Sequence, residues 1–314
     1  MILNVGGRTD IVNYYSEWLI NRINEGFVYS RNPLFPQKIS RYDLSPERID
    51  CIIFCSKNYK SILKYINEIN KRYRIICHYT ITAYGKDVEP NVPNIDDSID
   101  TLIKLSSIVG KEKVIWRYDP LLLTKKYTVQ VLIDTFEYIA SKVYNHISFA
   151  LFSFVEMYKK LEFNMPEIIQ FAEEDKIKLV KEIGKIAKKY NIRIQTCGTD
   201  IDYTKYGIRH SGCTTTEILE KANGIKYKNV KEGKMRKGCH CIPTRDIGAY
   251  DTCINGCKYC YANKRPEIAK DNYKLHNPNS PILIGQINKD DIVKEADQRS
   301  FIIECNNEKQ ISLI

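Results

Sequence analysis

An alternation of strand and helix that repeats six times is the feature that most constrains the fold of this 314-residue chain. Each repeat is a short apolar run followed by a longer segment with apolar residues at helical spacing. A helix that connects two strands of one sheet makes those strands parallel, because the chain must cross back before the next strand begins. We expect the six strands at residues 2–6, 51–55, 74–82, 113–118, 146–154 and 192–196.

This alternation predicts an α/β fold in which helices surround a mostly parallel sheet. We expect residues 1–196 to form six βα units of a parallel (β/α) barrel, either TIM-like or partial. An open doubly wound sheet is the alternative, but no glycine-rich phosphate loop follows the first strand. Within the first unit, runs at 27–32 and 37–42 flank Pro33-Leu34-Phe35-Pro36 and predict a hairpin.

Polar residues recur where the predicted strands end. In a parallel barrel, functional residues lie at the carboxyl ends of the strands, so these positions are candidates for catalysis. A helix cap is the structural alternative for the aspartate after the first strand, and a rim ion pair is the alternative for the last two candidates. The candidate catalytic residues are Arg8, Asp10, Lys57, Arg117 and Asp119.

Three cysteines near the C-terminal end form a C-x3-C-x2-C motif. They are Cys253, Cys257 and Cys260, and Tyr259 stands directly before the third. Three thiolates at this spacing can hold three corners of a cubane iron–sulfur cluster and leave the fourth iron open. A zinc site more often shows two pairs of cysteines or a mixture of cysteine and histidine. A zinc site and plain buried thiols remain the alternatives to a cluster.

Four more cysteines lie between the sixth strand and this motif. Four thiolates can complete a cubane cluster or a tetrahedral zinc site, and their scattered spacing does not decide between the two. We expect a second iron–sulfur cluster, with zinc as the alternative metal and incidental free thiols as the alternative without metal. His240 is expected to be a bystander, and Cys305 to stand alone. The four candidate ligands are Cys197, Cys213, Cys239 and Cys241.

The motif and the Tyr261-Ala262-Asn263 that follows it resemble the cluster loop of the radical S-adenosylmethionine (SAM) superfamily. The chain also resembles a bacterial family, the uncharacterised domain-of-unknown-function family 1848, over nearly residues 1–265. That family's reaction does not follow from the resemblance. Four further segments carry it: Arg8-Thr9-Asp10-Ile11, Glu89-Pro90-Asn91-Val92-Pro93, Trp116-Arg117-Tyr118-Asp119-Pro120 and Asp246-Ile247-Gly248.

The first resemblance implies a radical SAM enzyme. It implies that a [4Fe-4S] cluster with an open iron binds SAM and, with an electron from a donor such as flavodoxin or ferredoxin, cleaves it to a 5′-deoxyadenosyl radical. Tyr259 would pack at the cluster near the adenine. In most members the cysteine loop follows the first barrel strand, whereas here it follows all six. A permuted barrel, with the cysteine-rich metal-binding region 197–263 closing over its mouth, would bring Gly6 and Gly7 to the amino group of SAM.

The net charge of +10 is compatible with an anionic or nucleic-acid-derived substrate, although the basic residues are spread along the chain. No apolar run reaches the ~20 residues that span a bilayer. Residues 1–5 lack the basic segment and the longer apolar stretch of a signal peptide. We therefore expect a cytoplasmic protein without a membrane partner. A C-terminal extension, 264–314, contains apolar runs at 282–287 and 301–305.

Two other classes of function remain open. One is a non-catalytic iron–sulfur or zinc module that binds nucleic acid, in which the metal is structural and the positive charge is the working feature. The other is an electron-transfer protein with two clusters, although a barrel is far more scaffold than that task requires.

Overall fold

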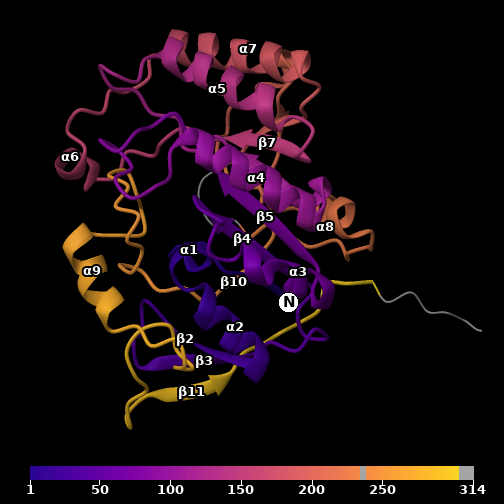
Figure 1. The fold of residues 1–314 in the computed structure, drawn as a ribbon, viewed down its shortest axis with the longest axis vertical. Coiled ribbons are helices and arrows are strands. Elements are labelled where there is room, and N and C mark those ends of the chain that lie inside the picture. Colours follow the sequence, from indigo (N-terminus) through magenta and orange to yellow (C-terminus); the bar gives the residue numbers. More distant parts are fainter. Residues whose placement is uncertain (234–237, 304–314) are drawn as a thin grey trace, which may run out of the picture.

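The computed structural model describes residues 1–233 and 238–303 (Figure 1). In these residues, eight parallel strands form the main sheet, in the order β10-β1-β4-β5-β6-β7-β8-β9. The predicted parallel α/β sheet is confirmed, and all six predicted strands belong to it. The strands are β1 (Ile2–Asn4), β4 (Cys51–Ser56), β5 (Ile75–Thr80), β6 (Val114–Arg117), β7 (Phe149–Phe152), β8 (Ile194–Thr196), β9 (Arg209–His210) and β10 (Arg245–Asp246).

Helices connect the strands, and the strand order rises along the chain from β1 to β9. Right-handed crossovers that never reverse direction put the connecting helices on one face of the sheet. This is not the order of a doubly wound sheet, which reverses at a switch point. The helices of this part are α1 (Ile11–Tyr14), α2 (Ser16–Glu25), α3 (Leu63–Arg72), α4 (Ile95–Val109), α5 (Val129–Val143), α6 (Leu161–Asn164) and α7 (Glu173–Lys189).

The sheet is open. Within the described residues, the edge strands β9 and β10 do not pair with each other, and each is only two residues long. Helix α8 (Thr216–Asn223) and residues 225–230 and 239–242 pack against the face of the sheet that the connecting helices leave uncovered, which we call the inner face. The predicted closure into a TIM barrel is not confirmed: the two edge strands are not paired with each other, and α8 packs on the inner face.

Apolar side chains pack on both faces of the main sheet. On the helix-covered face, Trp116 of β6 stacks on Phe136 of α5 with ring centroids 4.8 Å apart. The inner face has a second core, in which strand residues such as Ile53 and Ile76 pack with Leu219 of α8. Strands buried on both faces read as continuous apolar runs, which is why the sequence predicts them. Asn94 caps α4 by accepting a hydrogen bond from the Asp97 N–H.

A smaller sheet packs beside the first unit. The predicted hairpin is present as the antiparallel pair β2 (Phe27–Arg31) and β3 (Lys38–Asp43). Strand β11 (Ile292–Glu295) comes from the C-terminal extension and adds to β3 in parallel. Residues 197–263, expected as a distinct cysteine-rich region, contribute β9 and β10 to the main sheet.

The rest of the extension runs along the first unit. Helix α9 (Pro266–Lys274) follows the cysteine motif. The two apolar runs predicted in the extension make isolated bridges, in which Ile282 pairs with Tyr29 and Ile302 with Tyr227. The predicted lone cysteine, Cys305, lies outside the described residues.

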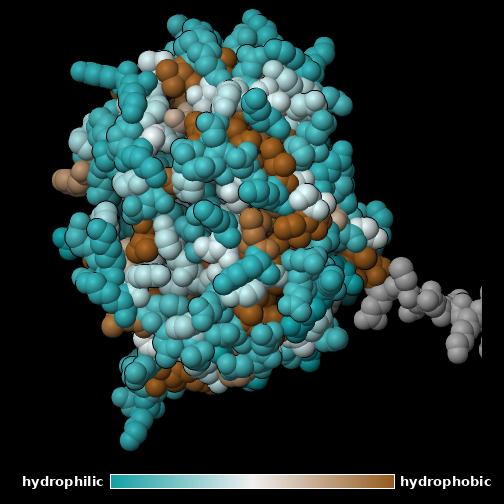
Figure 2. All heavy atoms as spheres, in the orientation of Figure 1, coloured by the Kyte–Doolittle hydropathy of each residue, from teal (hydrophilic) through white to brown (hydrophobic). Residues whose placement is uncertain are grey.

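Hydrophilic side chains cover most of the face that Figure 2 shows, and apolar residues lie between them. Among the described residues, no helix combines the length and the apolar character needed to span a bilayer.

His78 of β5 is a buried polar residue among the apolar side chains of the sheet. It is 1 % exposed, and neither ring nitrogen has a hydrogen-bond partner within the described part of the chain. Burial, assisted by the charge of Arg117, lowers the pKa of His78 from its ordinary value of 6.5 to about 4. The imidazole is therefore neutral in the folded protein at neutral pH.

Acid should destabilise the protein through His78. The unfolded state gains a proton near pH 6.5 and the folded state only near pH 4, so the free energy of unfolding falls between these values. The contribution should reach about 3 kcal/mol at the acid end. Replacing His78→Leu should remove it. Urea denaturation of both proteins between about pH 7 and pH 4 measures the difference, and parallel pH profiles would contradict the assignment.

Candidate functional site

The cysteine loop, residues 253–260, reaches the carboxyl edge of the main sheet although it follows all eight strands of that sheet in the sequence. It follows β10, which runs parallel to β1, so the chain leaves both strands at the same edge. Two tyrosines of the first helices hold it there: the Tyr15 hydroxyl donates to the Thr252 carbonyl at 2.7 Å, and the Tyr14 hydroxyl donates to Asn255 Oδ1 at 2.9 Å. The Asn91 N–H donates to the Asn255 carbonyl at 3.1 Å.

Asp10 links the first helix to the cysteine loop. Its Oδ1 caps α1 by accepting from the Asn13 N–H at 3.0 Å, and it also accepts from the Ser56 hydroxyl at 2.7 Å. Its Oδ2 accepts from Asn255 Nδ2 at 3.0 Å. Burial raises the pKa of Asp10, although these hydrogen bonds oppose the shift. The contacts describe a helix cap that anchors the loop, and the catalytic role of Asp10 stays a prediction.

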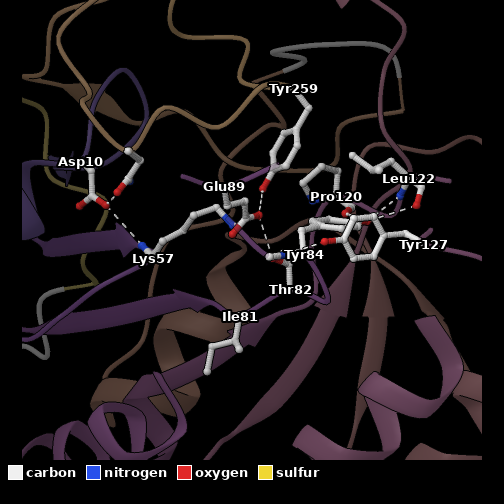
Figure 3. Close-up of polar contacts among 12 residues, drawn as sticks. Asp10, Lys57, Ile81, Thr82, Tyr84, Glu89, Pro120, Leu122, Tyr127 and Tyr259 are labelled. Atoms are coloured by element: carbon white, nitrogen blue, oxygen red, sulfur yellow. Dashed lines mark hydrogen bonds and ion pairs between the residues drawn. The ribbon is translucent and has the colours of Figure 1, made fainter. Parts of the chain in front are cut away.

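Glu89 is the centre of a buried hydrogen-bond network beside the loop (Figure 3). The side chain is 2 % exposed. Its Oε1 accepts from Lys57 Nζ at 2.9 Å and from Thr82 Oγ1 at 2.8 Å, and the Tyr259 hydroxyl donates to the same oxygen. One carboxylate thereby joins the segments after β4 and β5 to the aromatic residue of the motif.

Glu89 is not among the site residues that the sequence predicts. It lies in a long loop well beyond the end of β5, and a single glutamate there has no informative spacing. The signal that could have identified it is the Glu89-Pro90-Asn91-Val92-Pro93 segment, which carries part of the family resemblance.

Lys57 stays charged beside Glu89. Burial lowers the pKa of Lys57, but the negative charges of Glu89, the Cys257 thiolate and Asp119, with the hydrogen bond to Glu89, together outweigh burial, and the net shift is upward. The ammonium group also lies 5.7 Å from the centroid of the Tyr259 ring. That ring packs edge-on against Tyr84, with centroids 5.9 Å apart. The predicted residues Lys57 and Tyr259 are therefore neighbours at one end of the carboxyl edge.

Arg117 and Asp119 form the ion pair considered as the structural alternative. Arg117 ends β6, and its guanidinium donates to the Asp119 carboxylate, which also accepts from the Ser153 hydroxyl. Burial lowers the pKa of Arg117, but the charges of Asp119 and of thiols including Cys213 and Cys197 outweigh it, and the net shift is upward. Arg117 is thus a fixed positive charge close to the second set of cysteines.

Gly6, Gly7 and Arg8 pack against neighbouring strands. A Cβ on Gly6 would lie 2.2 Å from the Cys55 carbonyl oxygen, and one on Gly7 would lie 2.4 Å from Asp246 Oδ2, so Gly6 approaches a neighbouring backbone closely and Gly7 approaches a carboxylate closely. The Gly7 N–H donates to Asp246 Oδ2 at 2.8 Å. Arg8 lies 4.0 Å from the same carboxylate. Contact of the glycines with SAM stays a prediction.

Two of the three motif cysteines, Cys253 and Cys260, have backbone donors aimed at their sulfurs. The Ala262 N–H donates to Cys260 Sγ at 3.4 Å, and the N–H groups of Asn255 and Asp10 act on Cys253 in the same way. Burial nevertheless raises the pKa of Cys253 and Cys257. Hydrogen bonds to sulfur favour the thiolate and are a feature of iron–sulfur ligation. The donor set therefore fits a cluster held by three thiolates.

Three of the four other predicted ligands come together elsewhere on the same edge, and we call the four cysteines the four-thiol cluster. Cys197 directly follows β8, and Cys213 lies shortly after β9. The Sγ atoms of Cys197, Cys213 and Cys241 all lie within 4.8 Å of one another, and those of Cys213 and Cys241 are 3.3 Å apart. Cys239, two residues before Cys241, is not part of this compact group. This group could hold a metal ion.

His240 is directed to other partners. Its Nδ1 lies 3.0 Å from Glu232 Oε1, and its Nε2 lies 3.2 Å from His210 Nε2. The group of metal-ligating atoms found among the described residues consists of the three cysteine sulfurs and does not include this ring.

Glu89→Gln should destabilise the protein by about 3 kcal/mol, because Lys57 would keep its charge in a buried site without a counter-charge. Glu167→Gln is the matched control, since Glu167 pairs with Lys258 of the same loop at 2.9 Å but on the surface. It should cost less than about 1 kcal/mol. Chemical denaturation without oxygen measures both, and equal losses would show that Glu89 is not a buried anchor.

Known proteins can be set beside this geometry. No curated protein matches the chain. A family model, the domain of unknown function (DUF1848), matches residues 2–262. This range contains all strands of the main sheet described above, the cysteine loop and the four-thiol cluster. The chain therefore belongs to the DUF1848 family.

Proposed function

We propose that the protein is a radical SAM-type iron–sulfur enzyme. The observation that carries the proposal is the position of the cysteine loop, which follows all eight strands in the sequence and yet folds onto the carboxyl edge of the parallel sheet. Parallel α/β folds bind ligands and carry out chemistry at that edge. The loop is fixed there by Asp10 and by Tyr259 on Glu89. A metal site that only stabilised a separate lobe would not need these contacts.

The donor set supports a cluster with one open iron. Cys253, Cys257 and Cys260 would hold a [4Fe-4S] cluster, which leaves the fourth iron for the amino and carboxylate groups of SAM. When bound and reduced by a donor such as flavodoxin or ferredoxin, these cofactors supply a 5′-deoxyadenosyl radical that abstracts hydrogen from the substrate.

The chain's own residues bind, orient and exclude water. Hydrogen bonds from Asn255 to Asp10 and from Tyr259 to Glu89 fix the loop relative to the strand ends. This matters because a misplacement of reacting groups by ~1 Å can cost ~100-fold in rate. Positioning is therefore the role that we assign to Asp10 and Glu89. Lys57 supports Tyr259 through the shared carboxylate.

Arg117 is the strongest candidate for holding an anionic substrate. Its Nη2 donates to Asp119, and a guanidinium carries five N–H donors. Arg117 can thus hold Asp119 and a carboxylate or phosphate at the same time. Lys57 is instead neutralised by Glu89, and Arg8 lies against Asp246.

A non-catalytic metal module that binds nucleic acid is the competing proposal, and the net charge of +10 is the observation in its favour. Cleavage of SAM separates the two, because only the enzyme produces 5′-deoxyadenosine.

Purified without oxygen, the wild type should carry about four iron and four sulfide ions in a cubane cluster. With SAM and dithionite it should release 5′-deoxyadenosine. The triple variant Cys253→Ala, Cys257→Ala, Cys260→Ala should lose the cluster and the cleavage. Cys77→Ala, which removes a thiol buried on the helix-covered face, should keep both.

Two results would overturn the proposal. One is a wild type that holds zinc and no iron under these conditions. The other is an intact cluster that yields no 5′-deoxyadenosine, which would favour the binding module.

A further inference from the structure

The segment that follows β9 and the segment that precedes β10 meet at the four-thiol cluster. These strands are the two edges of the open main sheet. The segment just after β9 runs against the segment that leads to β10: the Ile242 N–H donates to the Thr214 carbonyl at 2.9 Å. A Cβ on Gly212 would lie 2.5 Å from the His240 carbonyl oxygen, so these backbones touch. The sheet edges do not pair, but the chain around them is in contact.

The sulfur spacing in this cluster suits a single ion. Tetrahedral zinc with Zn–S bonds of ~2.3 Å puts its ligand sulfurs roughly 3.8 Å apart. The Sγ atoms of Cys213 and Cys241 are 3.3 Å apart, and the three Sγ atoms of Cys197, Cys213 and Cys241 all lie within 4.8 Å of one another. The separation expected for zinc lies between these two distances. In a cubane each thiolate binds a different iron, so the cluster itself holds the sulfurs farther apart. Among the described residues, the motif cysteines do not form such a compact group.

We propose that Cys197, Cys213 and Cys241, with Cys239 as the fourth thiolate, bind one zinc ion and not a second iron–sulfur cluster. Four thiolates close the coordination shell, which is the mark of a structural zinc site. Cys197, Cys239 and Cys241 are at most 9 % exposed. This proposal does not depend on the radical SAM proposal, because it concerns different ligands and a different metal.

The neighbouring groups suit such an ion. Zinc with four thiolates carries two net negative charges, and the buried guanidinium of Arg117 is close enough to interact with Cys197 and Cys213. Around the ligands, the Gly233 N–H donates to the Cys241 carbonyl at 2.7 Å and Gln195 Nε2 donates to the Gly212 carbonyl at 2.7 Å. Such outer contacts orient the ligands of a metal.

The ion would join the two edges of the open sheet. Cys197 follows β8, Cys213 follows β9, and Cys239 and Cys241 precede β10, so the coordinate bonds span the gap that backbone pairing leaves. Because the site is absent from an unfolded chain, the free energy of zinc binding adds to the free energy of folding.

Metal analysis tests the assignment. We expect about one zinc per chain in the wild type and in the triple variant of Cys253, Cys257 and Cys260, which lacks iron. Zinc should fall at least about tenfold in Cys213→Ala, Cys241→Ala, and stay unchanged in Cys77→Ala. Zinc-edge X-ray absorption of the triple variant should show four sulfur ligands at ~2.3 Å, so the test does not require the double variant to fold.

Three outcomes would overturn the assignment. Iron and sulfide in the triple variant would mean a second cluster. Zinc bound through nitrogen or oxygen, or lost on brief dialysis against EDTA, would mean an adventitious ion only. A wild type without either metal would mean free thiols. SAM cleavage and the loop's iron are measured separately, so failure of one proposal is distinguishable from failure of the other.

Hydrogen exchange tests the bridging role. Complete removal of zinc with a strong chelator should accelerate exchange of the Ile242 amide, which bonds across the gap to Thr214. The Tyr118 amide, which donates to Leu151 within the sheet, is the control and should keep its rate. An unchanged rate at Ile242 would show that zinc does not hold the edges together.

Discussion

The parallel pairing of β10 with β1 brings the last third of the chain back to its first strand. It consists of two residue pairs, Leu3 with Arg245 and Asn4 with Asp246. So short a ladder contributes few hydrogen bonds, and side-chain contacts reinforce it: the Asp246 carboxylate accepts from the N–H groups of Gly7 and Gly248. The cysteine loop depends on this pairing for its place at the carboxyl edge, because it begins only a few residues after β10.

Two buried ion pairs then define the geometry of that edge. Lys57, after β4, pairs with Glu89, in the loop after β5, whereas Arg117 and Asp119 both lie at the end of β6. Taking four charges out of water is expensive, so these pairs stabilise the fold little compared with apolar contacts of similar size. Breaking one of them is costly, because the remaining charge stays buried. The side chains around the loop are therefore held in one arrangement.

The sequence predicts the six main strands and the hairpin because their residues pack on one or both faces and leave a periodic pattern. Strands β9 and β10 have two residues each and leave no such pattern. Strand β11 is exposed, and the apolar runs that suggested strands nearby make only isolated bridges. The residues of the candidate site also differ in whether the sequence predicts them. Motif spacing identifies Cys253, Cys257 and Cys260, whereas the contact among the four other thiols and the central position of Glu89 depend on long-range folding.

The return of β10 to β1 also has a consequence for synthesis on the ribosome. Roughly 240 residues separate the two strands in the sequence. At a synthesis rate of ~5–20 residues per second, the outer edge of β1 therefore waits tens of seconds for its partner. An unpaired edge is a template for wrong pairing, and the three-residue length of β1 limits that hazard. A nascent chain interrupted before residue 245 could form much of the sheet, yet it would contain neither the cysteine loop nor the last strand that positions it.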